Sequence, residues 1–394
     1  MNDSRGKGVA TALEWPVHRH DRNLSGRSGG TGAIRQPSVV REARYAAGRK
    51  VEMWAEDING DGQLEFIFIE SGKIRVKDRA DRLLWESEVC HPVIIGFHDL
   101  DGEGGEKHIV AAAFSRMLIV LSGATGELLW SYRFERKTVI LLHNKVRVGR
   151  ILPKLRGEQI TVWPEGDKWG YLFSFEDGVR NGKLVWKTKG IGVGERTRYR
   201  PNVLLGDIQG RGRNILIVIQ HTYIWGIDPE TGEHLWEVEG PRMRNYGLSA
   251  LLDVDGDGAD ELVFINDSVQ LRVSVLKWRN GAFEYVWSNY YGEDVRVMMT
   301  SHDPIRDVDG DGRLEILFSI GEIEAGYWYV EMLDASTGDV KERIENVRLL
   351  DFGDLDGDGV MELLLEQSDE CFALRKPGGG SAVVVFAGDE RPVP

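Results

Sequence analysis

The sequence predicts an all-β fold, a seven-bladed β-propeller with four antiparallel strands in each blade. Two repeated patterns predict it: a loop of alternating acidic residues and glycines between apolar strands, and a later hairpin with a glycine-containing or polar turn. Each pattern occurs seven times. Successive loops are separated by 42 to 56 residues, a spacing typical of propeller blades, with starts at 57, 99, 151, 207, 253, 307 and 354.

The seven loops differ in how completely they keep the acidic pattern. The four intact copies are DINGDGQLE (57–65), DVDGDGADE (253–261), DVDGDGRLE (307–315) and DLDGDGVME (354–362). The two degraded copies are DLDGEGGEK (99–107) and DIQGRGRNI (207–215). The remaining copy, GRILPKLRGEQITVW (149–163), keeps the strands without the loop acids.

The hairpins place a tryptophan at a similar position of the outer strand in five repeats. Glycine and other turn residues at the blade corners account for much of the glycine content, 48 residues in all. A large aromatic side chain at this repeated position predicts packing between blades rather than a ligand site. The five residues are Trp85, Trp130, Trp186, Trp236 and Trp287.

The repeats define one large domain, a single propeller over residues 49–394. Residues 1–48 form an N-terminal extension outside the seven units. Within it, 21–36 is rich in Gly, Ser and Arg and predicts a loop. Residues 37–45 could add a strand that closes the ring at the last blade.

Composition excludes several functional classes. With 42% hydrophobic residues the chain can bury a large core, and a net charge of −14 argues against binding to nucleic-acid backbones. No apolar stretch approaches the ~20 residues of a membrane span. The two cysteines, Cys90 and Cys371, exclude a disulfide scaffold and a cysteine zinc site. We expect a monomer.

The acidic loops have the donor pattern of calcium sites. In D-x-[DN]-x-D-G-x-x-E, side-chain oxygens stand at positions 1, 3, 5 and 9, and a backbone carbonyl is available at position 7. Calcium takes six to eight oxygen ligands, and glycines at positions 4 and 6 let the loop wrap around an ion. We therefore predict about four structural Ca²⁺ ions. Their ligands would be Asp57, Asn59, Asp61 and Glu65; Asp253, Asp255, Asp257 and Glu261; Asp307, Asp309, Asp311 and Glu315; and Asp354, Asp356, Asp358 and Glu362.

The degraded loops lack part of this donor set. The loop at 99–107 keeps Asp99, Asp101 and Glu103 but has Lys107 at position 9, so whether it binds metal stays open. The loop at 207–215 is predicted to bind none. An EF-hand is excluded because strands flank the loops and its twelfth-position Glu is missing. The predicted ligands of the four intact loops include 15 of the 63 acidic residues, so most of the net charge is concentrated at predicted metal sites.

The repeats resemble FG-GAP or VCBS repeats, the calcium-loop blades also found in the integrin alpha-chain propeller. The resemblance covers roughly residues 49–390. The hairpins at 124–130 and 231–236 and the opening segment 15–28 resemble PQQ-like propeller repeats. The resemblance implies a propeller with calcium on one face and ligands on the other, without identifying the ligand. The adjacent cysteine pair of quinoprotein dehydrogenases is missing, which argues against that activity.

The strand before each loop would line the central channel, so its start would lie on the face opposite the calcium. Residues five to eight places before each loop are rich in Arg, His, Tyr and Asn. Arginine suits bidentate recognition of carboxylates, and tyrosine offers a face to a sugar ring. The predicted ring contains Arg49, Lys50, His91, His143, Asn144, Tyr199, Arg200, Asn245, Tyr246, His302, Asn346 and Arg348.

Three functions remain open at this point. The first is a calcium-stabilised propeller that binds an acidic or polar glycan at the channel mouth. The second is a polysaccharide lyase that cleaves a uronate-containing glycan by β-elimination. In that reaction Arg200 or Arg348 would neutralise the carboxylate, and the proton transfers would fall to His or Tyr, with the candidates His91, His143, Tyr246 and His302. The third is an adhesion module with a protein partner.

Two observations bear on the location of the protein, and they disagree. Calcium sites of sensor strength or weaker would be mostly empty in the cytosol, which favours an extracellular or periplasmic protein in its mature form. The first residues, MNDSRGKGVATALEWP, lack the apolar segment of a signal peptide, which favours the cytoplasm.

Overall fold

The structure is a computed structural model in which the described part of the chain is built from β-strands. One short 3₁₀ turn, η2 (Val179–Asn181), lies between the strands β11 and β12. In this part of the chain no helix has the length and apolar character needed to cross a membrane. The model describes residues 53–386 except 64, 71, 79–81, 90, 114–115, 136–144, 165–166, 168, 190–201, 221–222, 241–248, 267–270, 293–294, 299–304, 309–310, 323–326, 354–361 and 368–381.

The described strands form seven antiparallel sheets, here numbered 1 to 7 in chain order. Sheet 1 contains β1 (Met53–Glu56), β2 (Glu65–Glu70), β3 (Lys73–Lys77) and β4 (Leu83–Glu86). Sheet 2 contains β5 (Val93–His98), β6 (His108–Ala113), β7 (Met117–Ser122) and β8 (Leu128–Arg133). Sheet 3 contains β9 (Val146–Gly149), β10 (Gln159–Val162), β11 (Trp169–Ser174) and β12 (Lys183–Lys189).

The later sheets follow the same order of strands. Sheet 4 contains β13 (Asn202–Gly206), β14 (Ile215–Gln220), β15 (Tyr223–Ile227) and β16 (His234–Glu239). Sheet 5 contains β17 (Ser249–Leu252), β18 (Glu261–Asn266), β19 (Leu271–Arg279) and β20 (Ala282–Gly292). Sheet 6 contains β21 (Val295–Met298), β22 (Ile305–Arg306), β23 (Glu315–Glu322), β24 (Tyr327–Asp334) and β25 (Val340–Glu345). Sheet 7 contains β26 (Val347–Gly353), β27 (Glu362–Gln367) and β28 (Ala382–Phe386).

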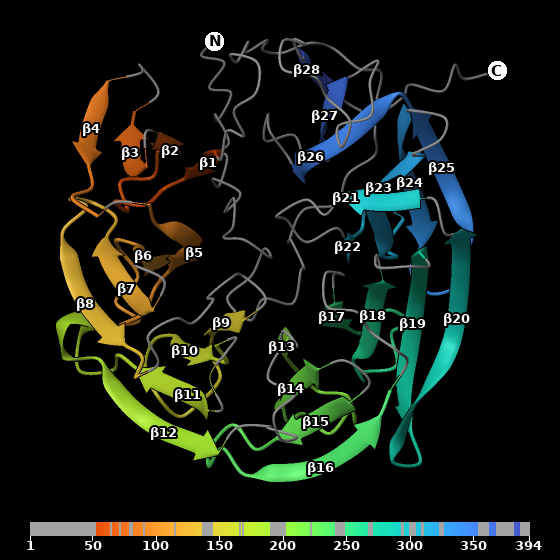
Figure 1. Cartoon of the computed structure of the whole chain (residues 1–394), viewed down its shortest axis with the longest axis horizontal. Helices are drawn as coiled ribbons and strands as arrows, with labels where there is room; N and C mark the ends of the chain where they lie inside the picture. The colour runs from red at the N-terminus through yellow and green to blue at the C-terminus, as the bar shows by residue number, and fades with distance from the viewer. Residues whose placement is uncertain are drawn as a thin grey trace, which may run out of the picture.

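The sheets stand side by side around a common centre in the order of the chain (Figure 1). In sheets 1 to 5 the first strand lies nearest the centre and the fourth lies outside. Six clusters of buried apolar residues each draw their members from two consecutive sheets, so the core of the protein lies between sheets. This arrangement is the propeller fold that the repeats predict.

Burial along the strands explains why the sequence folds in this way. The second strand, packed between two neighbouring sheets, is buried on both faces: every residue of β6 is buried, as is every residue of β10. The outer strands instead alternate between partly buried and exposed residues, as in β16 and β25. A continuous apolar run therefore marks an inner strand, and alternation marks the rim.

Two sheets differ from the predicted four strands. In sheet 6, β21 and β22 both pair with β23, so two short strands occupy the innermost position and the sheet has five strands. In sheet 7 the described residues form three strands. The N-terminal extension and the strand expected at 37–45 lie outside the described residues.

Tryptophans on the outer strands connect consecutive sheets, which confirms the predicted packing role of all five. Four of these indoles donate a hydrogen bond to a carbonyl in the third-to-fourth-strand turn of the next sheet. The pairs are Trp85 to Gly123 (2.8 Å), Trp130 to Gly182 (3.2 Å), Trp186 to Pro229 (2.9 Å) and Trp287 to Ala335 (2.9 Å). The fifth, Trp236, instead stacks on Trp278 of sheet 5, with ring centroids 4.3 Å apart.

The turns that receive these indoles need glycine. A Cβ added to Gly232 would lie 2.9 Å from the Trp186 ring, and one added to Gly126 would lie 2.5 Å from Trp85. Both glycines also have positive φ, 75° and 73°. Close approach and backbone conformation thus both explain the glycine of these hairpins.

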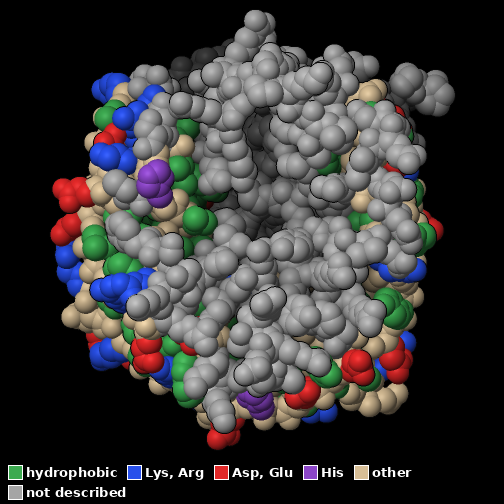
Figure 2. All heavy atoms as spheres, in the orientation of Figure 1, with side chains coloured by type: hydrophobic (Ala, Val, Ile, Leu, Met, Phe, Trp, Pro, Cys, Tyr) green, Lys and Arg blue, Asp and Glu red, His purple; other side chains and the backbone are tan. Residues whose placement is uncertain are grey.

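The visible face carries charges of both signs. Figure 2 shows acidic and basic side chains interspersed on the described part of this face. Opposite charges pair between neighbouring sheets, for example Lys154 with Glu230 at 2.9 Å and Arg180 with Glu127 at 2.6 Å. These four side chains are more than half exposed, so each pair contributes little to stability.

Candidate metal centres

Each acidic loop joins the first and second strands of a sheet, and we number the loops by sheet. In loops 1 (57–65), 5 (253–261) and 6 (307–315), position 2 is a buried aliphatic residue. Position 9 is a buried glutamate that begins the second strand. Each loop is therefore fixed to the core at both ends, while the described residues at positions 3 to 7 lie at or near the surface.

The buried glutamate joins the two ends of its loop. One carboxylate oxygen, Oε2, accepts the backbone N–H of position 2, and Oε1 remains for other partners. This hydrogen bond recurs in all three loops: Ile58 to Glu65 (3.2 Å), Val254 to Glu261 (3.0 Å) and Val308 to Glu315 (2.8 Å).

The aspartate at position 1 folds the middle of the loop around itself. Asp57 accepts the backbone N–H groups of Gly60 and Gly62, each at 2.9 Å. Asp253 does the same with Gly256 at 2.7 Å and Gly258 at 3.0 Å. The glycines have φ between 77° and 90°, a conformation that other residues rarely adopt. The repeated glycines thus create the turn that gathers the acidic side chains.

In loop 1, hydrogen bonds of Asn59 connect three of the four predicted ligands. The Asn59 side-chain amide donates to Glu65 Oε1 at 3.2 Å and to Asp61 Oδ2 at 3.3 Å. Asn59 Oδ1 accepts the backbone N–H of Asp61 at 2.8 Å. Asp61 and Glu65 supply oxygen donors of the hard type that calcium prefers, and the Asn59 amide hydrogen-bonds to both of them.

Loop 5 gathers the most acidic set. One oxygen from each of Asp253, Asp255 and Glu261 lies within 4.8 Å of the others. Glu261 is fully buried, and its Oε1 accepts no hydrogen bond. Buried carboxylate oxygens normally have a partner, and the nearest cationic group to this one is the ammonium of Lys277, at 2.8 Å. By donor type, the residues of loop 5 fit calcium.

A lysine ammonium group also lies among the loop 5 carboxylates. Lys277 Nζ lies 2.6 Å from Asp255 Oδ2, 2.7 Å from Asp257 Oδ2 and 2.8 Å from Glu261 Oε1. The last contact is an ion pair without hydrogen-bond geometry, since Glu261 Oε1 accepts no hydrogen bond. The four carboxylates of this loop therefore have one positive charge beside them.

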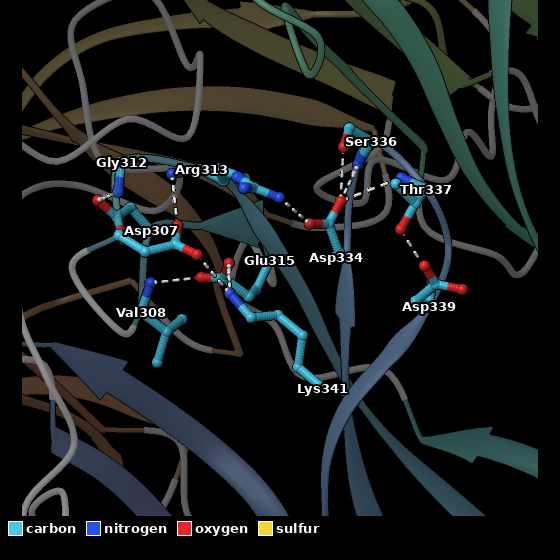
Figure 3. A network of polar contacts seen from close by, with 11 residues as sticks. Asp307, Val308, Gly312, Arg313, Glu315, Asp334, Ser336, Thr337, Asp339 and Lys341 are labelled. Carbon is cyan, nitrogen blue, oxygen red and sulfur yellow. Dashed lines mark hydrogen bonds and ion pairs between the residues drawn. The ribbon is translucent and has the colours of Figure 1, made fainter.

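In loop 6 the lysine beside the carboxylates belongs to the outer strand of its sheet, whereas Lys277 belongs to the third strand of sheet 5. Lys341, on the outer strand β25, lies 2.8 Å from Glu315 Oε1 and 3.0 Å from Asp311 Oδ2. Figure 3 shows Lys341 pointing to Glu315, whose other oxygen accepts the N–H of Val308. Asp307 accepts the N–H of Gly312 at 3.0 Å, as position 1 does in the other loops.

Burial and the neighbouring lysines shift the pKa values of the acidic groups in opposite directions. Burial raises the pKa of the Glu65 and Glu261 carboxyl groups. The hydrogen bond from Lys277 lowers the pKa of Asp257, and the one from Lys341 lowers the pKa of Asp311. Burial opposes the charge of Lys277, but its contacts with the three carboxylates outweigh burial and raise its pKa. The surface aspartates are thus held ionised, whereas the buried glutamates gain most from a neighbouring cation.

Loop 3 differs from loops 1, 5 and 6 at position 9. Gln159 takes the place of the buried glutamate, and its Oε1 accepts the N–H of Leu152 at 2.7 Å. Its Nε2 donates to the carbonyl of Gly157 at 2.9 Å, where a glutamate would present a second oxygen. The Gln159 amide thus satisfies the backbone hydrogen-bonding groups of the loop, so no cation is needed there.

Replacing Gln159 with glutamate is expected to destabilise the protein. Gln159→Glu would set a carboxylate oxygen against the carbonyl of Gly157 at a fully buried position, with none of the other loop acids present to recruit calcium. We expect a loss of about 2–4 kcal/mol in the free energy of unfolding, measured by denaturant titration with and without calcium. Rescue by calcium would contradict this account of loop 3.

The two degraded loops use their charged residues elsewhere. In loop 2, Lys107 pairs with Glu56 of sheet 1, and Arg156 of sheet 3 donates to Glu103 at 3.2 Å. In loop 4, Asp207 accepts three backbone N–H groups of its own loop. The backbone N–H of Asp260 in loop 5 donates to the carbonyl of Asp207 at 2.9 Å. These loops connect sheets rather than collect carboxylates.

Several predicted residues lie outside the described part of the chain. Among the metal ligands these are Asp309, Asp354, Asp356 and Asp358, and for Glu362, the first residue of β27, only the backbone is described. Among the predicted catalytic residues these are His143, Arg200, Tyr246 and His302. For Arg348 in β26 only the backbone is described, where it pairs with Glu366.

His91 is the predicted catalytic residue whose side chain is described. It is exposed, it precedes β5, and its φ of 52° is unusual for a residue other than glycine. Its backbone N–H donates to the carbonyl of Gly72 at 2.5 Å, and a Cβ on Gly72 would lie 2.7 Å from the imidazole. His91 therefore packs against the β2–β3 turn, at the end of β5 opposite loop 2.

The sequence analysis missed the lysines at loops 5 and 6 and the role of Gln159. Gln159 could have been found, because it stands at position 9 when Ile151 is taken as position 1. Lys277 could have been found only by counting register across the hairpin β18–β19. Lys341 comes from a strand that does not pair with the loop strand, so no local pattern indicates it.

Comparison with known proteins supports the fold. A model of the FG-GAP-like repeat matches residues 253–318, from loop 5 into sheet 6. No curated protein matches the chain. BBS1N, crystallised in complex with ARL6DN, has a TM-score of 0.59 at 11% identity, covering 92% of this chain and 99% of that one.

Two further solved structures are more distant. BamB from Moraxella catarrhalis has a TM-score of 0.47 at 13% identity, covering 95% of this chain and 99% of that one. The exotype rhamnogalacturonan lyase YesX has a TM-score of 0.49 at 13% identity, covering 91% and 75%. At these values BBS1N shows a shared fold alone, and the other two carry no conclusion. The comparisons thus establish a β-propeller that contains FG-GAP-like repeat sequence.

Proposed function

We propose that the chain is a seven-bladed, calcium-stabilised propeller that binds an acidic or polar glycan at the channel mouth opposite the calcium loops. The observation that supports the calcium part is the group formed by the fully buried Glu261 with Asp253 and Asp255, whose ligand oxygens lie within 4.8 Å of one another. In loop 1 the corresponding Glu65 is also buried and accepts the N–H of Ile58 in the same way. Calcium at extracellular concentrations would keep such loops occupied.

The ligand part rests on the direction of the inner strands. Because each inner strand ends at its acidic loop, the start of the strand lies at the opposite face. His91 precedes β5 in this way, with its imidazole exposed near the β2–β3 turn. The other residues of the predicted ring precede the other inner strands in the sequence, except Arg348, which is the second residue of β26, and their Arg, His, Tyr and Asn side chains suit carboxylate and hydroxyl groups of a glycan.

One experiment distinguishes glycan binding from glycan cleavage. The protein, with calcium, is incubated with a panel of uronate-containing polysaccharides while the absorbance of unsaturated uronate is followed, and the same glycans are tested for binding on an array. Binding without absorbance change supports the binding module, and an absorbance rise supports the lyase. Absence of both, with capture of a protein ligand instead, would overturn the glycan proposal in favour of adhesion.

A matched pair of variants tests the location of the ligand. Arg200→Ala is expected to weaken glycan binding by about tenfold or more, because a charge-assisted contact is lost. Arg180→Ala removes an arginine that is 58% exposed on the outer hairpin of sheet 3, and it should leave binding unchanged. Equal effects of the two variants would refute a site at the channel mouth.

A further inference from the structure

The ammonium group of Lys277 occupies the space between three predicted calcium ligands. Its contacts of 2.6 to 2.8 Å reach Asp255, Asp257 and Glu261, which stand at positions 3, 5 and 9 of loop 5. The lysine side chain is only 10% exposed, so it is directed inward rather than into solvent.

Strand register places Lys277 at this point. Leu262 pairs with Leu276, so Lys277 on β19 lies opposite Glu261, the first residue of β18. The same position holds an aspartate in sheet 6, where Asp334 pairs with Glu315. In sheet 1, Lys77 pairs with Phe66, which puts Asp78 in the position opposite Glu65. A lysine here is thus a departure of repeat 5 from repeats 1 and 6.

A calcium ion and this ammonium group cannot share the three carboxylates. Both would need the same oxygens, and two cations within a few ångströms repel each other strongly in a partly buried site. Lysine is a compact charge on a flexible stem, so it can leave the loop when an ion enters. Calcium binding at loop 5 therefore includes the cost of displacing Lys277.

We propose that Lys277 is an intramolecular competitor of calcium at loop 5. Without metal, its ammonium group neutralises part of the carboxylate charge and keeps the loop folded. With metal, its displacement weakens the affinity of this loop for the ion. The inference rests on the proposed calcium sites, and it adds that loop 5 responds to calcium at higher concentration than its donor set alone would require.

Loop 6 contains a partial version of the same arrangement. Lys341 contacts Glu315 and Asp311, two of the predicted ligands, and its side chain is 22% exposed. It belongs to β25, whereas Lys277 belongs to the third strand of its sheet. Two lysines from different strands thus lie beside the acidic loops at positions 5 and 9, which argues against a coincidence of one hairpin.

Calcium titration of chelator-treated protein by calorimetry tests the proposal. Lys277→Met keeps the length of the side chain without its charge, and we expect one site to bind calcium about tenfold or more tightly than in the wild type. Lys154→Met is the control, because it makes the same change of net charge at a lysine that is 80% exposed and pairs with Glu230. Identical isotherms for Lys277→Met and wild type would overturn the proposal.

The reverse exchange and a stability measurement keep the test independent of one variant. Asp78→Lys is expected to remove calcium binding at loop 1, whereas Asp78→Asn should keep it; retained binding in both contradicts the inference.

In calcium-free buffer, Lys277→Met should melt below the wild type, because four carboxylates lose their counter-charge. An equal melting temperature would refute that role. Wild type that binds no calcium would refute the proposed function, while a gain of one site in Lys277→Met remains a separate readout.

Discussion

Removal of calcium by a chelator is expected to lower the melting temperature on the order of 10 °C. A ligand at one hundred times its dissociation constant stabilises the folded state by about 2.7 kcal/mol per site, and the intact loops 1, 5 and 6 would contribute together. For a chain of this size that sum corresponds to a shift on the order of 10 °C. Differential scanning calorimetry before and after chelation, and again after calcium is restored, measures it.

Two controls connect this shift to the loops. Magnesium should restore little of the lost stability, because it demands a small octahedral site and releases its water reluctantly. Glu65→Gln should remove the contribution of loop 1, while Glu239→Gln changes an exposed carboxylate on β16 and should remove nothing. A melting temperature that is the same with and without calcium would refute the metal sites altogether.

Truncation of Trp186 is expected to be the most damaging single change described here. Its side chain is 9% exposed, it packs over Gly232, and its indole donates to the carbonyl of Pro229 at 2.9 Å. Trp186→Ala would leave a cavity between sheets 3 and 4 together with an unpaired carbonyl. We expect a loss of about 3–5 kcal/mol in the free energy of unfolding, measured by denaturant titration.

The same strand supplies the control for this prediction. Leu184 is 43% exposed, so Leu184→Ala should change the free energy of unfolding by less than about 1 kcal/mol. Trp186→Phe keeps most of the packing and loses the hydrogen bond, so it should fall between the two. If Trp186→Ala is as stable as Leu184→Ala, the contact between the sheets does not stabilise the protein.

The fold could be predicted because its signals are local and repeated. The apolar residues of β6 follow one another in the sequence, and the glycine turn at Gly126 is itself only a few residues long. The loop pattern likewise places Asp57 and Glu65 within nine residues. Position along the chain is then nearly sufficient to place a residue in space, since hairpins and short loops leave few alternatives.

The features that could not be predicted depend on contacts between distant segments. Lys341 reaches Glu315 from 26 residues away, and Lys107 of loop 2 pairs with Glu56 from 51 residues away. The division of the inner position of sheet 6 between β21 and β22 has no sequence signal that we recognise. Electrostatic partners are chosen by the folded geometry, because a flexible lysine can satisfy any of several nearby carboxylates.

The tryptophan contacts also bear on how the chain could change its number of repeats during evolution. Repeats 2 and 3 each offer a tryptophan to the next repeat and a glycine-containing turn to the previous one, so a duplicate of either repeat would bring both halves of the contact with it. The junction between sheets 4 and 5 is different, because Trp236 meets Trp278 rather than a turn carbonyl. Repeats 4 and 5 are matched to each other, and a duplication or deletion that separates them would leave two indoles without their partners.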